Sequence, residues 1–120
     1  EALCAEWMVE QAKQGKLPIP ATAVSSWWGT NPTKRAQDDI DVLAADRISK
    51  RLVIGECKYR ETFDESAEID DLESKRDLVK GFIASNFMLF CKHDVSDATK
   101  KKLAAREDWR IVTLEEMYID

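Results

Sequence analysis

Three charged side chains lie within two segments that are otherwise apolar. Asp41 interrupts the run "DDIDVLAAD" (38–46), and Glu56 and Lys58 close the run "RLVIGECKY" (51–59). Charged groups are rarely buried unless they pair with an opposite charge or bind a metal. These three residues are therefore the candidates for a functional site, and a satisfied salt-bridge cluster is the alternative.

Two carboxylates and one ammonium group form a set that suits metal-dependent hydrolysis of phosphodiesters. The oxygens of Asp41 and Glu56 are suitable ligands for Mg²⁺ or Mn²⁺, which activates water and offsets charge in the transition state. The ammonium group of Lys58 could orient or deprotonate that water. The spacing alone is a weak signal, because charged residues make up 34% of the chain.

The segments 38–46 and 51–59 read as two strands of an antiparallel hairpin, joined by the short connection "DRISK". Period-two alternation puts Glu56 and Lys58 on one face of the second strand. In the right register, Asp41 on the first strand comes close to Glu56. The hairpin therefore brings the three charges to one end of a sheet.

The same alternation assigns faces to the first strand. Ile40 is predicted to share a face with Val42, and Asp41 to share the other with Leu43. Both faces are largely apolar, so we expect both strands to be covered on two sides.

The remaining pattern predicts a mixed α/β fold of the order α–β–β–β–α–β–α–β. Helical spacing of apolar residues and capping signals favour helices, and apolar runs favour strands. We expect helices at 1–14, 64–82 and 96–106, strands at 23–30, 86–92 and 109–114, and a helical turn at 115–120.

Composition indicates one globular domain over residues 1–120, which we expect to have been excised from a longer chain. No apolar run approaches the ~20 residues of a membrane span, so no membrane partner and a cytoplasmic location are expected.

The three cysteines show no metal-ligand spacing and read as reduced core thiols. A net charge of −5 argues against a strong sequence-independent grip on DNA.

One basic surface is nevertheless possible. Its members are lysines 100–102 together with Lys75, Arg76, Lys80 and Lys92. An ordinary solvated helix face is the alternative to a surface that binds phosphates.

Four short motifs, "CAEWMVE", "SSWWGT", "DIDVLA" and "GECKYRE", give the chain a family resemblance when taken in this order. Over roughly residues 1–92 the chain resembles the PD-(D/E)XK nuclease superfamily. Within it, the chain is similar to the nuclease-like C-terminal domain of archaeal-type AAA-class (DEXX-box) ATPases. The resemblance implies a restriction-endonuclease-like sheet and an ATPase domain N-terminal to it in the full chain.

The resemblance also implies a role for each residue that matches the motifs. Asp41 and Glu56 match the metal ligands, and Lys58 matches the lysine of the motif. Glu6, on the first helix, matches an acidic residue that often completes the metal site, although Glu10 could compete for this role. Ile40 stands where the superfamily name has proline.

Three functions follow as alternatives. The first is a DNA endonuclease-like domain that depends on Mg²⁺ or Mn²⁺. The second is a non-catalytic domain that binds DNA or a protein. The third is a regulatory unit of an ATPase whose nuclease site is a relic; no Walker-type loop occurs in these 120 residues, so ATP would bind elsewhere.

Overall fold

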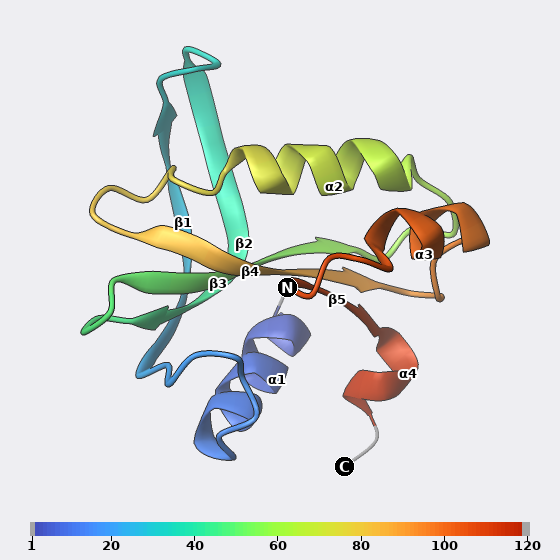
Figure 1. Cartoon of the computed structure of the whole chain (residues 1–120), viewed down its shortest axis with the longest axis horizontal. Coiled ribbons are helices and arrows are strands. Elements are labelled where there is room, and N and C mark those ends of the chain that lie inside the picture. Colours follow the sequence, from blue (N-terminus) through green and yellow to red (C-terminus); the bar gives the residue numbers. More distant parts are fainter. Residues whose placement is uncertain (1, 119–120) are drawn as a thin grey trace.

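The computed structural model describes residues 2–118 and places four helices and five strands among them (Figure 1). In chain order they are α1 (Ala2–Lys13), β1 (Ala23–Asn31), β2 (Ala36–Asp46), β3 (Arg51–Lys58), α2 (Glu65–Ser74), β4 (Ile83–Cys91), α3 (Asp97–Leu103), β5 (Trp109–Thr113) and α4 (Leu114–Met117). Among these described helices, none has the length and apolar character needed to cross a membrane.

The five strands form one mixed sheet in the order β1-β2-β3-β4-β5. The first three strands pair antiparallel, as two successive hairpins. The pairs β3–β4 and β4–β5 are parallel, and each is connected by a helix, α2 or α3. A sheet of this kind with helices packed on it confirms the mixed α/β class expected from the sequence.

Helices cover both faces of the sheet, with α1 on one face and α2 on the other (Figure 1). On the first face, Trp7 and Met8 of α1 pack against Val42, Val53 and Phe90 of three different strands. Burial of aromatic and aliphatic side chains of this size dominates the stability of a small domain. Strand β3 is thus covered on both sides, as its apolar sequence predicted.

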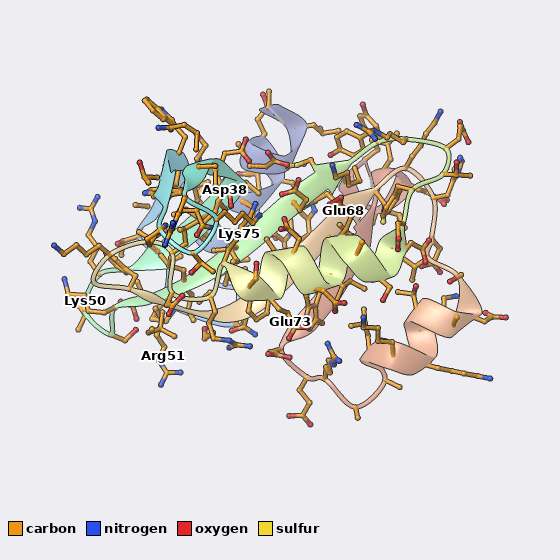
Figure 2. The ribbon with its side chains drawn as sticks, turned by 90° about the horizontal axis from the view of Figure 1, so that it is seen from above. Asp38, Lys50, Arg51, Glu68, Glu73 and Lys75 are labelled. Atoms are coloured by element: carbon orange, nitrogen blue, oxygen red, sulfur yellow. The ribbon has the colours of Figure 1, made fainter. Side chains whose placement is uncertain are left out.

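On the second face, Leu72 of α2 packs against Ile40, Leu52, Ile54 and Phe87 of the sheet. Because α2 packs on the middle strands, its polar side chains lie near the start of β2 and the end of β3. Figure 2 shows Asp38 of β2 and Lys75, directly after α2, close together beside the helix.

Strand β2 carries a bulge that the sequence did not predict. Ser25 is opposite Leu43 and Trp27 is opposite Ile40, so one residue of β1 faces two residues of β2, Asp41 and Val42. The extra residue reverses the alternation at this point. Ile40 therefore packs on the same face as Leu43, and the prediction that it shares a face with Val42 was wrong.

Helix α2 is shorter than the predicted helix at 64–82. Asp64 caps it, accepting a hydrogen bond from the N–H of Ala67, and the helix ends at Ser74. Beyond Ser74 the chain turns back toward β4 through Gly81, whose φ of 86° suits glycine best. The apolar residues of this return, Leu78, Val79 and Phe82, still pack against the core, which explains why their spacing resembled a helix.

The three cysteines are free thiols, as expected. Cys4 and Cys91 are buried and Cys57 is half-buried. The thiol of Cys4 lies 2.7 Å from the phenol oxygen of Tyr59, which joins α1 to the segment that follows β3.

Candidate metal centre

Asp41 occupies the bulge of β2 and faces the end of β3. The β2–β3 ladder runs as far as the pair Val42–Gly55. Beyond this pair, the Oδ2 atom of Asp41 accepts a hydrogen bond of 2.9 Å from the backbone N–H of Cys57. The side chain of Asp41 therefore accepts a hydrogen bond from β3 where the backbone pairing of the hairpin ends. This bond holds its carboxylate beside the backbone of the residue that follows Glu56.

Glu56 is the most perturbed carboxyl group of the site. Its side chain is 13% exposed, and its Oε2 atom is buried without a hydrogen-bond partner among the described residues. Burial, and next the negative charge of Asp41, raise the pKa of Glu56 to about 8. An unpartnered buried carboxyl oxygen is costly, so it marks a position where a missing partner would be stabilising.

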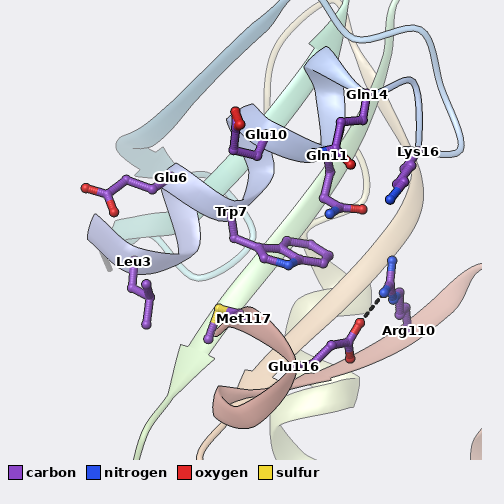
Figure 3. A pocket seen from close by; sticks show the side chains of 10 residues that line it. All are labelled: Leu3, Glu6, Trp7, Glu10, Gln11, Gln14, Lys16, Arg110, Glu116 and Met117. Carbon is purple, nitrogen blue, oxygen red and sulfur yellow. Dashed lines mark hydrogen bonds and ion pairs between the residues drawn. The ribbon is translucent and has the colours of Figure 1, made fainter. Parts of the chain in front are cut away.

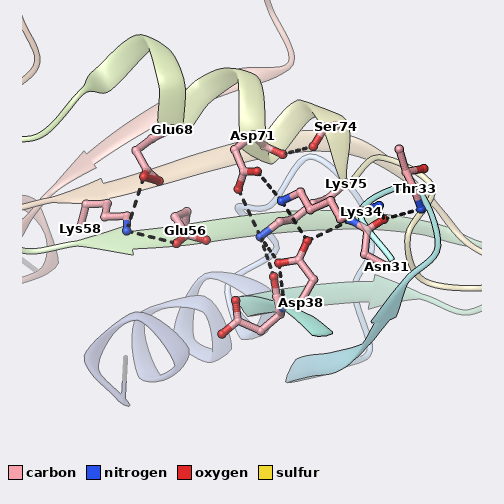
Figure 4. Close-up of polar contacts among 11 residues, drawn as sticks. Asn31, Thr33, Lys34, Asp38, Glu56, Lys58, Glu68, Asp71, Ser74 and Lys75 are labelled. Carbon is pink, nitrogen blue, oxygen red and sulfur yellow. Dashed lines mark hydrogen bonds and ion pairs between the residues drawn. The ribbon is translucent and has the colours of Figure 1, made fainter. Parts of the chain in front are cut away.

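Lys58 links Glu56 to the helix above the sheet (Figure 4). Its Nζ atom lies 3.8 Å from Oε1 of Glu56 and 3.5 Å from Oε1 of Glu68 in α2. These contacts put Glu56 and Lys58 on the α2 face of the sheet. Glu68 was not singled out from the sequence, because its position on an acidic helix gives no signal that distinguishes it from its neighbours.

Glu6 is exposed on α1, the helix that covers the opposite face of the sheet. It lines a cavity of about 560 Å³, together with Trp7, Glu10 and Arg110 (Figure 3). Among residues 2–118, no hydrogen bond or ion pair joins it to Asp41 or Glu56. The structure thus brings Asp41, Glu56 and Lys58 together, while a role for Glu6 as a ligand stays a prediction.

A second charged cluster adjoins the site, centred on Lys75. Its side chain is 3% exposed, and its ammonium group donates a 2.7 Å hydrogen bond to the backbone carbonyl of Asp39. It also lies 3.2 Å from Asp38 and 3.4 Å from Asp71 (Figure 4). The positive charge of Lys75 acts on Glu56 as well, partly opposing the rise of its pKa.

Lys75 lies neither on a basic surface nor on a solvated helix face, the two alternatives considered from the sequence. The side chain is buried because the helix ends at Ser74 and directs Lys75 toward β2, where three acceptors surround it. The spacing of four residues between Asp71 and Lys75 is the one signal that could have indicated a pair.

The donors present determine which metal the site could hold. Within the described part of the chain, no three His, Cys, Asp or Glu side chains gather as a ready-made metal site. Asp41 and Glu56 offer two carboxylates, one of them with an unpartnered oxygen. Mg²⁺ commonly takes one or two carboxylates and completes its shell with water and substrate phosphates. The residues present therefore fit Mg²⁺ or Mn²⁺, and they fit Zn²⁺ poorly because no His or Cys joins them.

A family described as archaeal and bacterial proteins of unknown function, DUF234, matches residues 1–75. This is more than half of the chain. The chain belongs to the DUF234 family. No curated protein matches it in sequence.

The fold of this DUF234 protein also occurs in protein VC1899 from Vibrio cholerae. The two structures agree with a TM-score of 0.65 at 20% sequence identity. The similarity covers 94% of this chain but 29% of VC1899, so this chain spans less than a third of the length of that protein. At this identity the likeness establishes a shared fold.

The part of the chain that matches DUF234 contains all the residues of the candidate site. It includes α1, the hairpin of β2 and β3, and α2. Strands β4 and β5 lie outside the match and supply the second half of the sheet.

Proposed function

We propose that this DUF234 chain is a nuclease-like domain that hydrolyses phosphodiesters of DNA with a divalent metal ion. The observation that carries the proposal is the buried, unpartnered Oε2 atom of Glu56 beside the carboxylate of Asp41. A divalent cation would satisfy that oxygen, displace the proton of Glu56 and neutralise the two carboxylates. Apolar packing does not explain two neighbouring carboxylic acids, because removing such groups from water is costly unless they gain a partner.

Asp41 and Glu56 would hold the metal, which when bound would polarise a phosphate oxygen and lower the pKa of a water molecule. Asp41 is oriented for this by its hydrogen bond from Cys57. Lys58, with a side chain that is 20% exposed, has its ammonium group between Glu56 and Glu68. Its ammonium group would position the attacking water and stabilise negative charge that develops on the phosphate. Glu6 is proposed to assist if α1 brings it to the metal.

The resemblance to the PD-(D/E)XK superfamily supports the same assignment. The motifs "DIDVLA" and "GECKYRE" supply Asp41, Glu56 and Lys58, which are the residues that the sheet brings together. It also supports an ATPase domain as the partner within the full-length chain. DNA is proposed as the substrate on this resemblance and on the chemistry of the site.

A plasmid-nicking assay in Mg²⁺ and in Mn²⁺ tests the proposal. We expect conversion of supercoiled to open-circular DNA by the unmodified protein and its loss in both Glu56→Ala and Lys58→Ala. Lys13→Ala is a matched control, because Lys13 is exposed and pairs weakly with Glu10 on α1. Nicking that survives both site substitutions would come from a contaminant and would contradict the proposal.

One observation favours a second candidate, a non-catalytic interaction domain. Lys58 already pairs with both Glu56 and Glu68, so an internal cation partly neutralises the site. In this case the cluster would be structural, and metal would neither stabilise the protein nor support cleavage. A rise of the melting temperature with millimolar Mn²⁺, lost in Glu56→Ala, separates the two candidates in favour of the metal site.

A further inference from the structure

Four cations gather at the end of the sheet away from Glu56. Arg47 and Lys50 lie in the turn between β2 and β3, Arg51 is the first residue of β3, and Lys80 lies in the neighbouring connection between α2 and β4. We call these four residues the turn patch. None of them has a carboxylate of another described residue within 4.0 Å.

The two turns that carry the patch are held together. The N–H of Ile83 donates a 3.0 Å hydrogen bond to the carbonyl of Lys50, and the ammonium group of Lys50 lies 5.3 Å from the centre of the Phe82 ring. Between them is a hollow of about 560 Å³ that Lys50, Arg51 and Arg76 line. Two of the four patch cations, Lys50 and Arg51, therefore line a preformed depression.

Two acidic side chains near the patch, Asp46 and Asp108, are already engaged. Asp46 is 6% exposed and accepts hydrogen bonds from the N–H groups of Ile48 and Ser49 and from the Ser49 hydroxyl. Asp108 lies 3.7 Å from Arg76, and Arg76 is not counted in the patch for this reason. Arg51 also acts on Asp46 and helps to lower its pKa, so Arg47 and Lys50 are the turn cations whose charge is most available to an external anion.

Most cations of the possible basic surface considered from the sequence are, in contrast, paired within the protein. Lys100 lies 2.9 Å from Asp94, and Lys102 lies 2.8 Å from Asp70. Lys92 pairs with Glu61. These lysines offer little charge to a partner, so the helix α3 is the weaker candidate for an anion-binding surface.

Exposed apolar side chains accompany the turn patch. Ile48 at the tip of the β2–β3 turn is 95% exposed, and Ile83 beside the hollow is 52% exposed. Lys50 and Arg51 stand at this end of the ribbon, with Glu68 farther along the helix (Figure 2). An isoleucine flanked by basic residues is a combination that groove-binding proteins present to duplex DNA, where the cations contact phosphates and the apolar group contacts base edges or sugars.

We propose that the turn patch binds the phosphate backbone of duplex DNA, with Ile48 directed into a groove. The cations extend over two turns, which suits an extended polyanion better than a single phosphate ion. Arg51 and Glu56 are five residues apart on β3, or about 17 Å at the usual rise per residue. This separation places the turn patch at the opposite end of β3 from the candidate metal site, with α2 packed on the sheet between them. The choice of DNA over another polyanion rests on the function proposed above.

Fluorescence anisotropy of a labelled duplex in EDTA tests the inference without any metal chemistry. Against the unmodified protein, the variant Arg47→Ala/Lys50→Ala/Arg51→Ala is expected to bind at least ~10-fold more weakly at low salt. The slope of log K against log salt should fall by about two to three, near one for each phosphate contact removed. The matched control Lys100→Ala/Lys101→Ala/Lys102→Ala removes equal charge from α3 and should bind within about twofold of the unmodified protein.

Three results would overturn the inference. The first is an equal loss of DNA affinity in both triple variants, and the second is an unchanged DNA affinity in the turn variant. The third is a protein that binds phosphatidylserine vesicles but does not bind DNA. The turn residues are exposed, so urea denaturation should show both variants folded. If the turn triple variant is not folded, the milder variant Arg47→Gln/Lys50→Gln removes two of the charges and should lower the salt slope by about one to two; an unchanged slope would overturn the inference. Because EDTA prevents hydrolysis, this experiment measures binding alone. A protein that binds DNA in EDTA but does not nick plasmid DNA in Mg²⁺ or Mn²⁺ would support this inference and contradict the nuclease proposal.

Discussion

The carboxylate of Asp41 accepts a 2.9 Å hydrogen bond from the backbone N–H of Cys57, at the place where the ladder between β2 and β3 stops. This one contact joins the bulge of β2 to the residue directly after Glu56. It also keeps a negative charge beside Glu56, which together with burial raises the pKa of that residue. Asp41 thus has a structural role through its oxygen and an electrostatic role through its charge, and substitutions can separate them.

Asp41→Asn retains an oxygen acceptor for Cys57, so we expect its free energy of unfolding in EDTA to change by less than about 1 kcal/mol. Asp41→Ala leaves the N–H unpaired and should cost about 1–3 kcal/mol. Both should abolish the rise in melting temperature on addition of Mn²⁺. Urea and thermal denaturation measure these effects, and a Mn²⁺ response that persists in Asp41→Ala would locate the ion elsewhere.

Glu56 makes stability depend on pH in a specific direction. The folded state keeps the proton of Glu56 up to about pH 8, whereas the unfolded chain releases it near 4.5. The contribution of protonated Glu56 to the free energy of unfolding is therefore complete below pH 4.5, and it is lost as the pH rises from about 4.5 to about 8. Glu56→Gln should remove the decline, which is on the order of 5 kcal/mol for a shift of this size.

Urea denaturation in EDTA at pH 5, 6, 7 and 8 measures the decline. Glu10→Gln is the control, because the Glu10 side chain is 57% exposed and far less constrained. An identical pH profile for Glu56→Gln and the unmodified protein would show that Glu56 ionises normally in the folded state.

Lys58 should separate catalysis from metal binding. Lys58→Met keeps most of the apolar stem and removes the ammonium group that contacts Glu56 and Glu68. We expect Mn²⁺ to stabilise this variant as well as it stabilises the unmodified protein, or better, because a competing cation is gone. Nicking of plasmid DNA should fall by at least ~100-fold, the usual contribution of a positioned acid–base or electrostatic group. Full activity in Lys58→Met would exclude Lys58 from the reaction.

Lys75 should matter for stability far more than its charge alone suggests. Removing its ammonium group leaves the Asp38 carboxylate and the Asp39 carbonyl without a partner. Lys75→Met should therefore lower the free energy of unfolding by about 3–5 kcal/mol. The double variant Lys75→Met/Asp38→Asn should recover part of this loss, because it removes the uncompensated charge. Chemical denaturation of the two single variants and the double variant measures the coupling; strict additivity would show that the two residues act independently.

The sequence predicted the hairpin that carries the site because alternation along β3 is regular. Glu56 and Lys58 share a face, and Asp41 lies next to Glu56, as period two and a short turn require. The strand order along the chain followed from apolar runs and turn residues in the same way.

The features that were missed depend on contacts distant in sequence. The bulge at Asp41 arises from pairing with β1, which no pattern within β2 reveals. The end of α2 at Ser74 places Lys75 against Asp38, 37 positions earlier, and local spacing could not distinguish it from an exposed lysine. Partners of surface lysines, such as Asp94 for Lys100, are also set by tertiary structure.

The crystal structure of this protein soaked in Mn²⁺ tests the central claim most directly. The metal-site account predicts an anomalous density peak in contact with one oxygen of Asp41 and with Oε2 of Glu56, the oxygen that has no partner in the described protein. It also predicts that the peak is absent in crystals of Glu56→Gln soaked in the same way. A structure without a peak at this position, with Lys58 still paired to Glu56 and Glu68, would contradict the account and identify the three charges as an ion-pair cluster.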